Sequence, residues 1–428
     1  MNLSNKNILI CGMGKSGKAA AHFLEKHGAV ITLKNLNPDD IIKNFDLVVI
    51  SPGIPFDLPP LEKARAAGIP IWGEVELAYR FCPCPIIAIT GTNGKTTVTT
   101  LVGEIMQRHN GKTVVAGNIG TPFTEQISSL KPDNLVVAEV SSFQLETASE
   151  FAPKISAVLN LTPDHLDRHK TMDIYRRTKE RIFANQSPGD FAVLGYDNPL
   201  TRKMRPLCDT VFFSAKEQLD SGVFLENGII KARLPQLSDK ELEIADINKV
   251  KILPENALAA TALCLCAGAT PKTIAEGLLT FKGVEHRIEY VTTINDVEFY
   301  NDSKATNVDS AIKGLEAMKR PVILIGGGYD KKTDFTDWVR CFSGKVKHLI
   351  VLGESANQII ETCKLCGFKN YDKVNSLDDA VRLAYSKASP GDCALLSPAC
   401  ASWDMFDNFE QRGNLFKEIA AKIFQSQH

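Results

Sequence analysis

The chain has 428 residues, of which 44% are hydrophobic and 23% are charged, and its formal net charge is -1. This length predicts about two to four domains at ~100–200 residues each, and the composition is that of a soluble globular protein. The near-neutral charge excludes strong long-range attraction to nucleic acid or an anionic membrane. No apolar run reaches the ~18 residues that span a bilayer. Since the chain starts without a signal-peptide pattern, we expect a cytoplasmic protein.

The 11 cysteines include only three close pairs, Cys82–Cys84, Cys264–Cys266 and Cys363–Cys366. A zinc site needs about four ligands at fixed spacing, and the sequence offers no second pair in a suitable pattern. We therefore expect reduced, mostly buried thiols rather than a metal site or a disulfide framework.

The first ~80 residues predict a Rossmann-like unit. Ile8–Cys11 has the pattern of a strand, the turn Gly12-Met-Gly-Lys-Ser-Gly17 follows it, and Lys18–His27 has that of a helix; Ala29–Leu33 and Leu47–Ser51 are the next strands. The G-x-G-x-x-G turn suits a dinucleotide. However, the second strand lacks the acidic residue that would bind a nicotinamide cofactor's ribose. This favours another phosphate-bearing ligand, with nicotinamide binding or a purely architectural turn as alternatives.

A phosphate loop opens the next unit, after the Pro-rich linker Phe81–Pro85. Ala88-Ile-Thr-Gly-Thr-Asn-Gly-Lys-Thr96 stands between a strand over Pro85–Ile89 and a helix from Thr96 to about His109. Loop N–H groups and the helix N-terminus attract phosphate. Lys95 would reach the β/γ-phosphates, and the Thr96 hydroxyl would bind Mg²⁺. Because Ile89 stands where the common pattern has its first glycine, a simple Gly/Thr-rich turn is the alternative.

Short apolar runs predict the remaining sheets. Thr113–Ala116, Leu135–Val140, Ala157–Asn160 and Phe191–Leu194 are expected strands of a mostly parallel sheet, residues 211–252 short antiparallel strands at its edge, and Glu255–Ala267 a helix. After residues 283–287 the pattern restarts, with strands over Val297–Asn301, Val322–Gly326, Leu349–Leu352 and Cys393–Leu396 and helices over Val308–Met318 and Leu377–Ala388.

Polar groups follow many of these strands, at the sheet edge where open α/β sheets bind ligands. Glu139 would hold Mg²⁺ opposite Thr96, and His165 would bind a metal or a substrate carboxylate. Asp302 and Lys304 would share one anionic ligand, and Arg287 would bind phosphate. For each of them an ordinary loop or surface position is the alternative. By residue chemistry alone, Lys179 is interpreted as a solvated helix charge.

These motifs resemble the Mur ligase family over nearly the whole chain. The resemblance is carried by Gly91–Thr97, Gly117–Gly120, Ser141–Leu145, Thr162–Arg168, Asn301–Asn307 and Leu396–Ser402. Folylpolyglutamate synthases share the phosphate loop, whereas the last two motifs are typical of the Mur ligases that add D-glutamate.

The resemblance implies an α/β fold in three domains. These are a Rossmann-like domain that binds UDP (residues 1–82), a central P-loop ATPase-type domain with a mostly parallel sheet that binds ATP and magnesium (83–284), and a Rossmann-like C-terminal domain that binds the amino acid (285–428). The implied activity is ATP-dependent addition of D-glutamate to UDP-N-acetylmuramoyl-L-alanine through an acyl phosphate, in peptidoglycan precursor synthesis. The implied protein is a cytoplasmic monomer without nucleic-acid or membrane partners. A related ligase with another acceptor, or a non-catalytic nucleotide-binding protein, is the alternative.

The resemblance also assigns roles to residues. The catalytic residues are Lys95, His165, Lys179 and Lys304. The nucleotide is bound by Gly91, Thr92, Asn93, Gly94, Lys95, Thr96 and Thr97, together with Asn256, Arg287 and Asp302. The acceptor and D-glutamate are bound by Ser16, Ser51, Gly53, Asn118 and His165, and by Thr306, Lys331, Ser402 and Phe409. Two magnesium ions are implied, held through Thr96, Glu139, His165 and a carbamylated Lys179.

Overall fold

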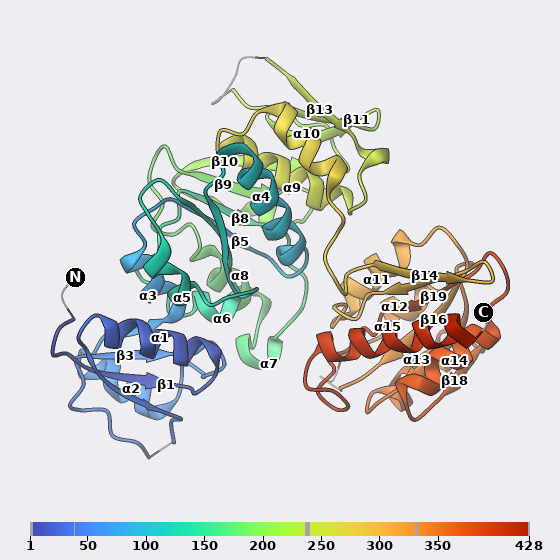
Figure 1. Cartoon of the computed structure of the whole chain (residues 1–428), viewed down its shortest axis with the longest axis horizontal. Coiled ribbons are helices and arrows are strands. Elements are labelled where there is room, and N and C mark those ends of the chain that lie inside the picture. The colour runs from blue at the N-terminus through green and yellow to red at the C-terminus, as the bar shows by residue number, and fades with distance from the viewer. Residues whose placement is uncertain (1–2, 38, 236–239, 330–332, 427–428) are drawn as a thin grey trace. The chain divides into compact units, whose positions relative to one another are not determined.

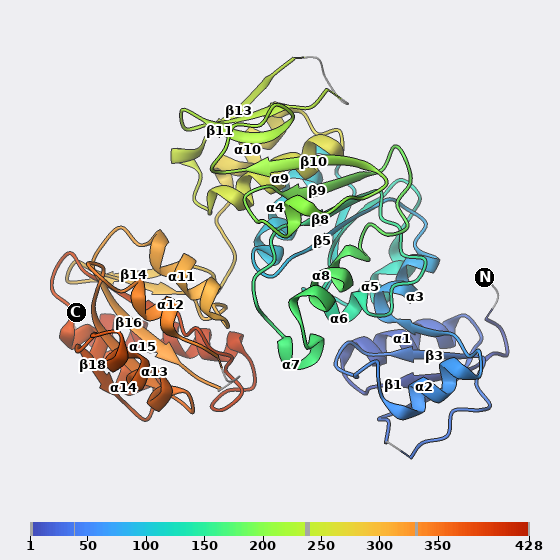
Figure 2. The ribbon, with the colours of Figure 1, turned by 180° about the vertical axis from the view of Figure 1, so that it is seen from behind.

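The computed structural model describes residues 3–37, 39–235, 240–329 and 333–426. The chain divides into two compact units, Met1–Lys282 and Gly283–His428. Among the described residues the strands form three sheets, of which the first unit contains two and the second unit one (Figure 1). Both units are α/β, with helices beside mostly parallel sheets, as the sequence predicts (Figure 2).

The first sheet has the order β2-β1-β3-β4, and its neighbouring strands are parallel. Its elements are β1 (Asn7–Cys11), α1 (Lys15–Lys26), β2 (Val30–Lys34), β3 (Leu47–Ile50), α2 (Pro59–Ala66), β4 (Ile71–Gly73) and α3 (Glu74–Phe81). Helix α1 begins before the predicted Lys18, because the turn after β1 is short. A Cβ at Gly17 would lie 1.9 Å from the Gly12 carbonyl oxygen, so this turn requires glycine.

The second sheet has the order β13-β12-β11-β10-β9-β8-β5-β7-β6. Its strands are β5 (Ile86–Thr90), β6 (Thr113–Gly117), β7 (Leu135–Glu139), β8 (Ile155–Val158), β9 (Phe191–Gly195), β10 (Asp209–Ser214), β11 (Gly222–Glu226), β12 (Ile229–Arg233) and β13 (Leu242–Asp246). The expectation of antiparallel pairing throughout 211–252 is wrong for β10, which is parallel to both β9 and β11. Its buried Val211 and Phe213 continue the parallel sheet, and helix α9 (Pro254–Cys266) contacts it. Among the described strands of this sheet, only the pairs β11–β12 and β12–β13 are antiparallel.

The helices of this part are α4 (Lys95–Asn110), α5 (Phe123–Gln126), α6 (Ser142–Leu145), α7 (Leu166–His169), α8 (Met172–Glu180), α9 and α10 (Pro271–Thr280). Helix α4 follows the phosphate loop, as predicted, and ends at Gly111 in the left-handed conformation.

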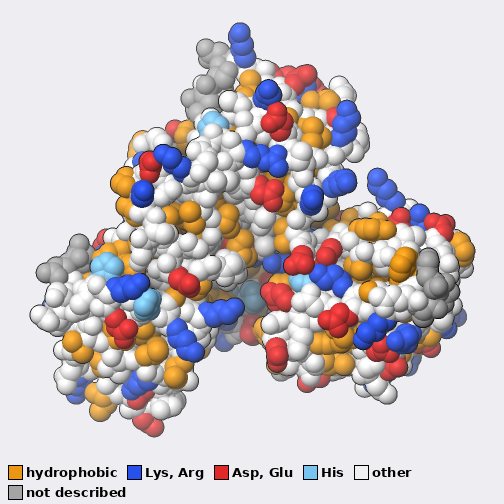
Figure 3. All heavy atoms as spheres, viewed as in Figure 1, with side chains coloured by type: hydrophobic (Ala, Val, Ile, Leu, Met, Phe, Trp, Pro, Cys, Tyr) orange, Lys and Arg blue, Asp and Glu red, His pale blue; other side chains and the backbone are white. Residues whose placement is uncertain are grey.

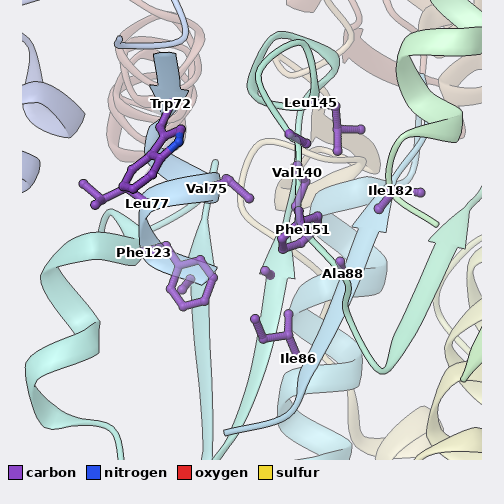
Figure 4. Close-up of a cluster of buried hydrophobic side chains, with 14 of the residues drawn as sticks. Trp72, Val75, Leu77, Ile86, Ala88, Phe123, Val140, Leu145, Phe151 and Ile182 are labelled. Carbon is purple, nitrogen blue, oxygen red and sulfur yellow. The ribbon is translucent and has the colours of Figure 1, made fainter. Parts of the chain in front are cut away.

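One hydrophobic core joins the two sheets of the first unit. Trp72 and Val75 belong to the same buried cluster as Ile86, Phe123 and Phe151 (Figure 4). On α3, the buried Glu76 carboxylate accepts hydrogen bonds from the backbone N–H groups of residues 149–151 and from Arg80. These charge-assisted bonds offset the burial of the carboxylate, so the first sheet is anchored to the second by polar contacts as well.

The second unit contains a sheet of order β14-β15-β19-β16-β17-β18. Its elements are β14 (Glu289–Ile294), β15 (Val297–Asn301), α11 (Val308–Ala317), β16 (Val322–Gly327), α12 (Thr336–Arg340), β17 (Val346–Leu352), α13 (Ala356–Leu365), β18 (Tyr371–Lys373), α14 (Leu377–Lys387), β19 (Cys393–Leu396) and α15 (Phe409–Ser426). Of the neighbouring strand pairs that the structure describes in this sheet, only β14–β15 is antiparallel. Two buried clusters pack this sheet, one around Trp338 and one around Phe416.

Positive and negative side chains are interspersed on the visible face of each unit (Figure 3). Within the described ranges, no helix combines the length and the apolar character that crossing a bilayer would require. The structure shows no disulfide among the described residues, which include all 11 cysteines, and most of these thiols are buried.

Candidate active site

The phosphate loop links β5 to α4 through strained backbone that only glycine adopts readily. Gly91 has a φ of +150° and Gly94, at the N-cap of α4, a φ of +86°. A Cβ at Gly94 would lie 2.5 Å from Asn256 Oδ1. The loop therefore lies against Asn256 and presents the N-terminus of a 16-residue helix, where a phosphate is favoured.

Asn160, just beyond the end of β8, holds this loop. Its side-chain oxygen accepts from the Asn93 N–H at 2.9 Å, its amide donates to the Asn93 carbonyl at 3.1 Å, and its own carbonyl accepts from the Thr92 N–H at 3.0 Å. Thr92 Oγ1 also lies 3.2 Å from the hydroxyl of the buried Tyr175. The roles of Asn160 and Tyr175 were missed at the sequence level, although Asn160 was placed at a strand end, where such a role is expected.

Two lysines converge on one carbonyl oxygen of the loop. Lys95 Nζ lies 3.0 Å from the Gly91 oxygen and 2.8 Å from that of Thr92. Lys179 Nζ lies 3.0 Å from the same Gly91 oxygen and 3.1 Å from Thr90 Oγ1. Lys179 is only 1% exposed, so its interpretation as a solvated helix charge is wrong. Burial, and next the charge of Lys95, hold the pKa of Lys179 well below its ordinary value, which favours a neutral amine.

Glu139 lies at the end of β7 and is 2% exposed. Its Oε1 accepts from the Asn118 side-chain amide at 2.9 Å, whereas its buried Oε2 has no hydrogen-bond partner among the described residues. An unpartnered buried carboxylate oxygen is costly and fits a cation ligand. The described residues contain no group of three His, Cys, Asp or Glu side chains arranged to hold a metal.

His165 precedes α7 with a left-handed φ of +53°. Its side chain is 35% exposed and its Nε2 lies 3.6 Å from Asp164 Oδ2, while its ring packs against Phe143 with centroids 4.8 Å apart. The nearby His169 is buried, and its Nε2 lies 2.9 Å from Ser142 Oγ. Burial, followed by the charges of neighbouring groups, lowers the pKa of His169 to about 4. His165 is therefore the accessible histidine of this loop and His169 a neutral packing residue.

The predicted UDP residues lie at the carboxyl ends of β1 and β3. Ser51 N–H donates to the Cys11 carbonyl at 2.9 Å, and a Cβ at Gly12 would lie 2.6 Å from Ser51 Oγ. Ser16 lies in the first turn of α1, partly buried, and Gly53 is exposed. The structure thus brings the glycine turn and the Ser51–Ile54 turn together at one edge of the first sheet.

In the second unit, Asp302 and Arg287 form one cluster. Asp302 is fully buried, accepts from Ser397 Oγ at 2.8 Å, and lies 3.6 Å from the Arg287 guanidinium. Burial raises the pKa of Asp302 to about 6, against the opposing effect of Arg287. Arg287 also donates to Ser310 Oγ.

The residues predicted to bind the amino acid lie around two loops of the second unit, one after β15 and one after β19. Lys304 Nζ lies 5.0 Å from the centroid of the Phe409 ring, and the Lys304 N–H donates to the His286 carbonyl. Thr306 is partly buried and Ser402 is 2% exposed. Lys331 lies outside the described residues.

Arg412 on α15 ties these two loops together and was missed at the sequence level. The buried guanidinium donates to Ser303 Oγ at 3.0 Å, the Ser303 carbonyl at 2.8 Å, and the Cys400 and Ala401 carbonyls at 3.1 and 3.3 Å. In sequence, an arginine on an amphipathic helix is indistinguishable from a solvated charge, so no signal pointed to it.

Comparison with known proteins places the chain among the Mur-type ligases. The Mur ligase middle domain matches residues 89–264, and the Mur ligase, glutamate ligase domain matches residues 286–400. The MurC UDP-N-acetylmuramate-alanine ligase of Thermotoga maritima is similar with a TM-score of 0.62 and 20% identity over 99% of this chain and 100% of that chain. The MurF ligase of the same organism, solved in complex with ADP, has a TM-score of 0.63 and 15% identity over 98% of this chain and 96% of that chain.

At the sequence level, the UDP-N-acetylmuramoylalanine–D-glutamate ligase of Thermoanaerobacter sp. (strain X514) is 43% identical over 99% of this chain and 100% of its own length. The chain therefore belongs to the UDP-N-acetylmuramoylalanine–D-glutamate ligase family. It is accordingly an ATP-dependent amide-bond ligase of the Mur type, and the resemblance noted from its motifs is confirmed.

Proposed function

We propose that this chain joins D-glutamate to UDP-N-acetylmuramoyl-L-alanine, with conversion of ATP to ADP and phosphate. The observation that carries the proposal is the convergence of Lys95 and Lys179 on the Gly91 carbonyl of the phosphate loop. A carboxylate is a poor electrophile, so forming an amide from it requires an activated leaving group. A loop that holds a nucleotide's terminal phosphates beside the cationic Lys95 can supply that activation.

The proposed nucleotide contacts come from Gly91–Thr97, with Asn256 against Gly94. The loop N–H groups bind the phosphates, and Lys95 leaves its carbonyl partners for the β/γ-phosphates. Asn256 would contact the adenine, and Arg287 and Asp302 the phosphate and ribose. A neighbour with the same fold was solved with ADP, which supports nucleotide binding in this architecture.

We assign two Mg²⁺ ions to Thr96, Glu139, His165 and Lys179. Bound Mg²⁺ neutralises charge that develops on the transferred phosphoryl group. The unpartnered Oε2 of Glu139 supports this assignment. Lys179 would take part as a carbamate: a buried amine with a lowered pKa adds to carbon dioxide with loss of a proton, and the product is an anionic oxygen ligand instead of a repelling cation.

The acceptor would be bound at its UDP end by Ser16, Ser51 and Gly53 and near its reacting end by Asn118 and His165. Lys304, Thr306, Lys331, Ser402 and Phe409 would bind D-glutamate and the γ-phosphate. We further propose domain boundaries at 1–82, 83–284 and 285–428, and a monomer that works in the cytoplasm on small molecules alone.

The proposed reaction has two steps. The L-alanine carboxylate of the acceptor attacks the γ-phosphorus of ATP, giving an acyl phosphate and ADP. Lys95 and Lys304 stabilise the charge on the transferred group. The D-glutamate amine then attacks the acyl carbon, and the tetrahedral intermediate expels phosphate as the amide forms.

The test is phosphate release from ATP by the purified chain with UDP-N-acetylmuramoyl-L-alanine and either D-glutamate, L-glutamate, or a folate with L-glutamate. We expect phosphate release and a new amide product only with the first pair. Turnover only with the folate would assign a folylpolyglutamate-type activity. Nucleotide binding without turnover in any mixture would identify a non-catalytic binding protein.

A further inference from the structure

The Arg168 guanidinium spans two loops that come from different sheets of the first unit. Its Nη1 donates to the Pro52 carbonyl at 3.1 Å and its Nη2 to the Ile54 carbonyl at 3.0 Å. Those carbonyls belong to the turn that follows β3, whereas Arg168 lies on α7, in the loop region after β8. One side chain thus links segments 116 and 114 residues apart in the sequence.

The same guanidinium also contacts Glu146 and Phe143, which follow β7 of the second sheet. Its Nε and Nη2 lie 3.0 and 2.5 Å from the two carboxylate oxygens of Glu146, a bidentate pair. Its central carbon lies 4.3 Å from the centroid of the Phe143 ring, and that ring packs against His165. The Arg168 and Glu146 side chains are only 17% and 14% exposed, so solvent weakens this pair less than it would on an open surface.

Only arginine can make this set of contacts. Its planar guanidinium carries five N–H donors in a fixed geometry, and here they serve a carboxylate on one side and two carbonyls on the other. A lysine ammonium is a single point charge and cannot bridge these partners simultaneously.

We propose that Arg168 is a positioning residue that sets the Ser51–Ile54 turn at a fixed separation from His165. The proposal rests on the proposed function in one respect: there the acceptor's UDP end meets the turn and its reacting end meets His165. A ligand held at both ends binds tightly only when the two holding points are already in register, because ordering them on binding costs binding free energy. Arg168 thus acts on the acceptor through the Ser51–Ile54 turn and the segment that carries His165.

The test compares Arg168→Gln and Arg168→Lys with the control Arg181→Gln. Arg181 also donates to the Leu145 and Glu146 carbonyls, but among the described residues its hydrogen bonds do not extend to the turn. The first readout is amide hydrogen exchange over residues 51–56, where the Ile54 N–H donates to the Ser51 carbonyl. The second is the KM for the acceptor and for ATP.

Arg168→Gln should speed exchange of the 51–56 segment and raise the acceptor KM, each by about tenfold, which corresponds to about 1.4 kcal/mol. The ATP KM should change by less than about twofold, Arg168→Lys should lie between Gln and wild type, and Arg181→Gln should match wild type. Unchanged exchange in a folded Arg168→Gln protein would overturn the proposal, as would an unchanged acceptor KM in an active enzyme. If the wild-type chain has no ligase activity, the proposed function fails, and the exchange result alone decides the role of Arg168.

Discussion

Replacing Gly94 with alanine separates backbone strain from disturbance of the nucleotide site. Gly94 has a φ of +86°, and Gly111, at the other end of the same helix, has a φ of +69°. An alanine in this left-handed region costs about 1–2 kcal/mol. A Cβ at Gly111 meets nothing within 4 Å, whereas a Cβ at Gly94 would lie 2.5 Å from Asn256 Oδ1 and 3.3 Å from Leu159 Cδ1. Gly111→Ala is therefore a matched control for strain alone.

Both variants should lose about 1–2 kcal/mol of unfolding free energy, measured by denaturant titration. Only Gly94→Ala should also displace Asn256. Loss of one hydrogen bond of about 0.5–1.5 kcal/mol between Asn256 and adenine would raise the ATP KM about two- to tenfold. The reasoning is refuted if the two variants show the same ATP KM, because the contact with Asn256 would then have no part in nucleotide binding.

Further predictions concern buried ionisable groups. The pKa of Asp302 is raised to about 6. The protonated carboxyl group therefore contributes fully to stability below about pH 4, and this contribution is lost as the pH rises through 6. Asp302→Asn should flatten this pH dependence when denaturation of the second unit is followed. The pKa of His169 is lowered to about 4, so its effect on stability runs the other way. The neutral ring contributes to stability above about pH 6.5, and this contribution is lost as the pH falls towards 4. His169→Phe should therefore make the stability less sensitive to acid between these pH values. A steeper pH profile in either variant would contradict the assignment. Arg412→Lys should destabilise the second unit by about 2–4 kcal/mol in calorimetry, since it leaves buried carbonyls of the two loops unpartnered; an unchanged melting temperature would show that these bonds contribute little.

Local sequence patterns were sufficient to predict the structure where the residues of a motif are consecutive. The strand, glycine loop and helix around Lys95 were predicted within a few residues, because the motif and its flanking apolar runs are contiguous. The places of Glu139 and Asp302 at the ends of strands were predicted because parallel strands bring their carboxyl ends to one edge; their roles stay predictions. The pairing direction of β10 was predicted wrongly, because a short apolar run has the same composition in either orientation.

Residues whose partners are distant in sequence were the ones misjudged. Lys179 looked like a surface charge because nothing near it in the sequence shows that α8 turns it towards the phosphate loop. Arg168 contacts a carbonyl 116 residues away and Arg412 one 109 residues away, and a backbone carbonyl leaves no trace in the identity of its residue. Such contacts follow from the packing of whole elements, which local propensity does not specify.

The most direct test of the proposed reaction follows one oxygen atom. UDP-N-acetylmuramoyl-L-alanine with ¹⁸O in the alanyl carboxylate is incubated with the enzyme, ATP and D-glutamate, and the released phosphate is examined by mass spectrometry. If the carboxylate attacks the γ-phosphorus, one ¹⁸O atom appears in each phosphate released. Phosphate without ¹⁸O, formed while the amide product accumulates, would contradict an acyl phosphate intermediate.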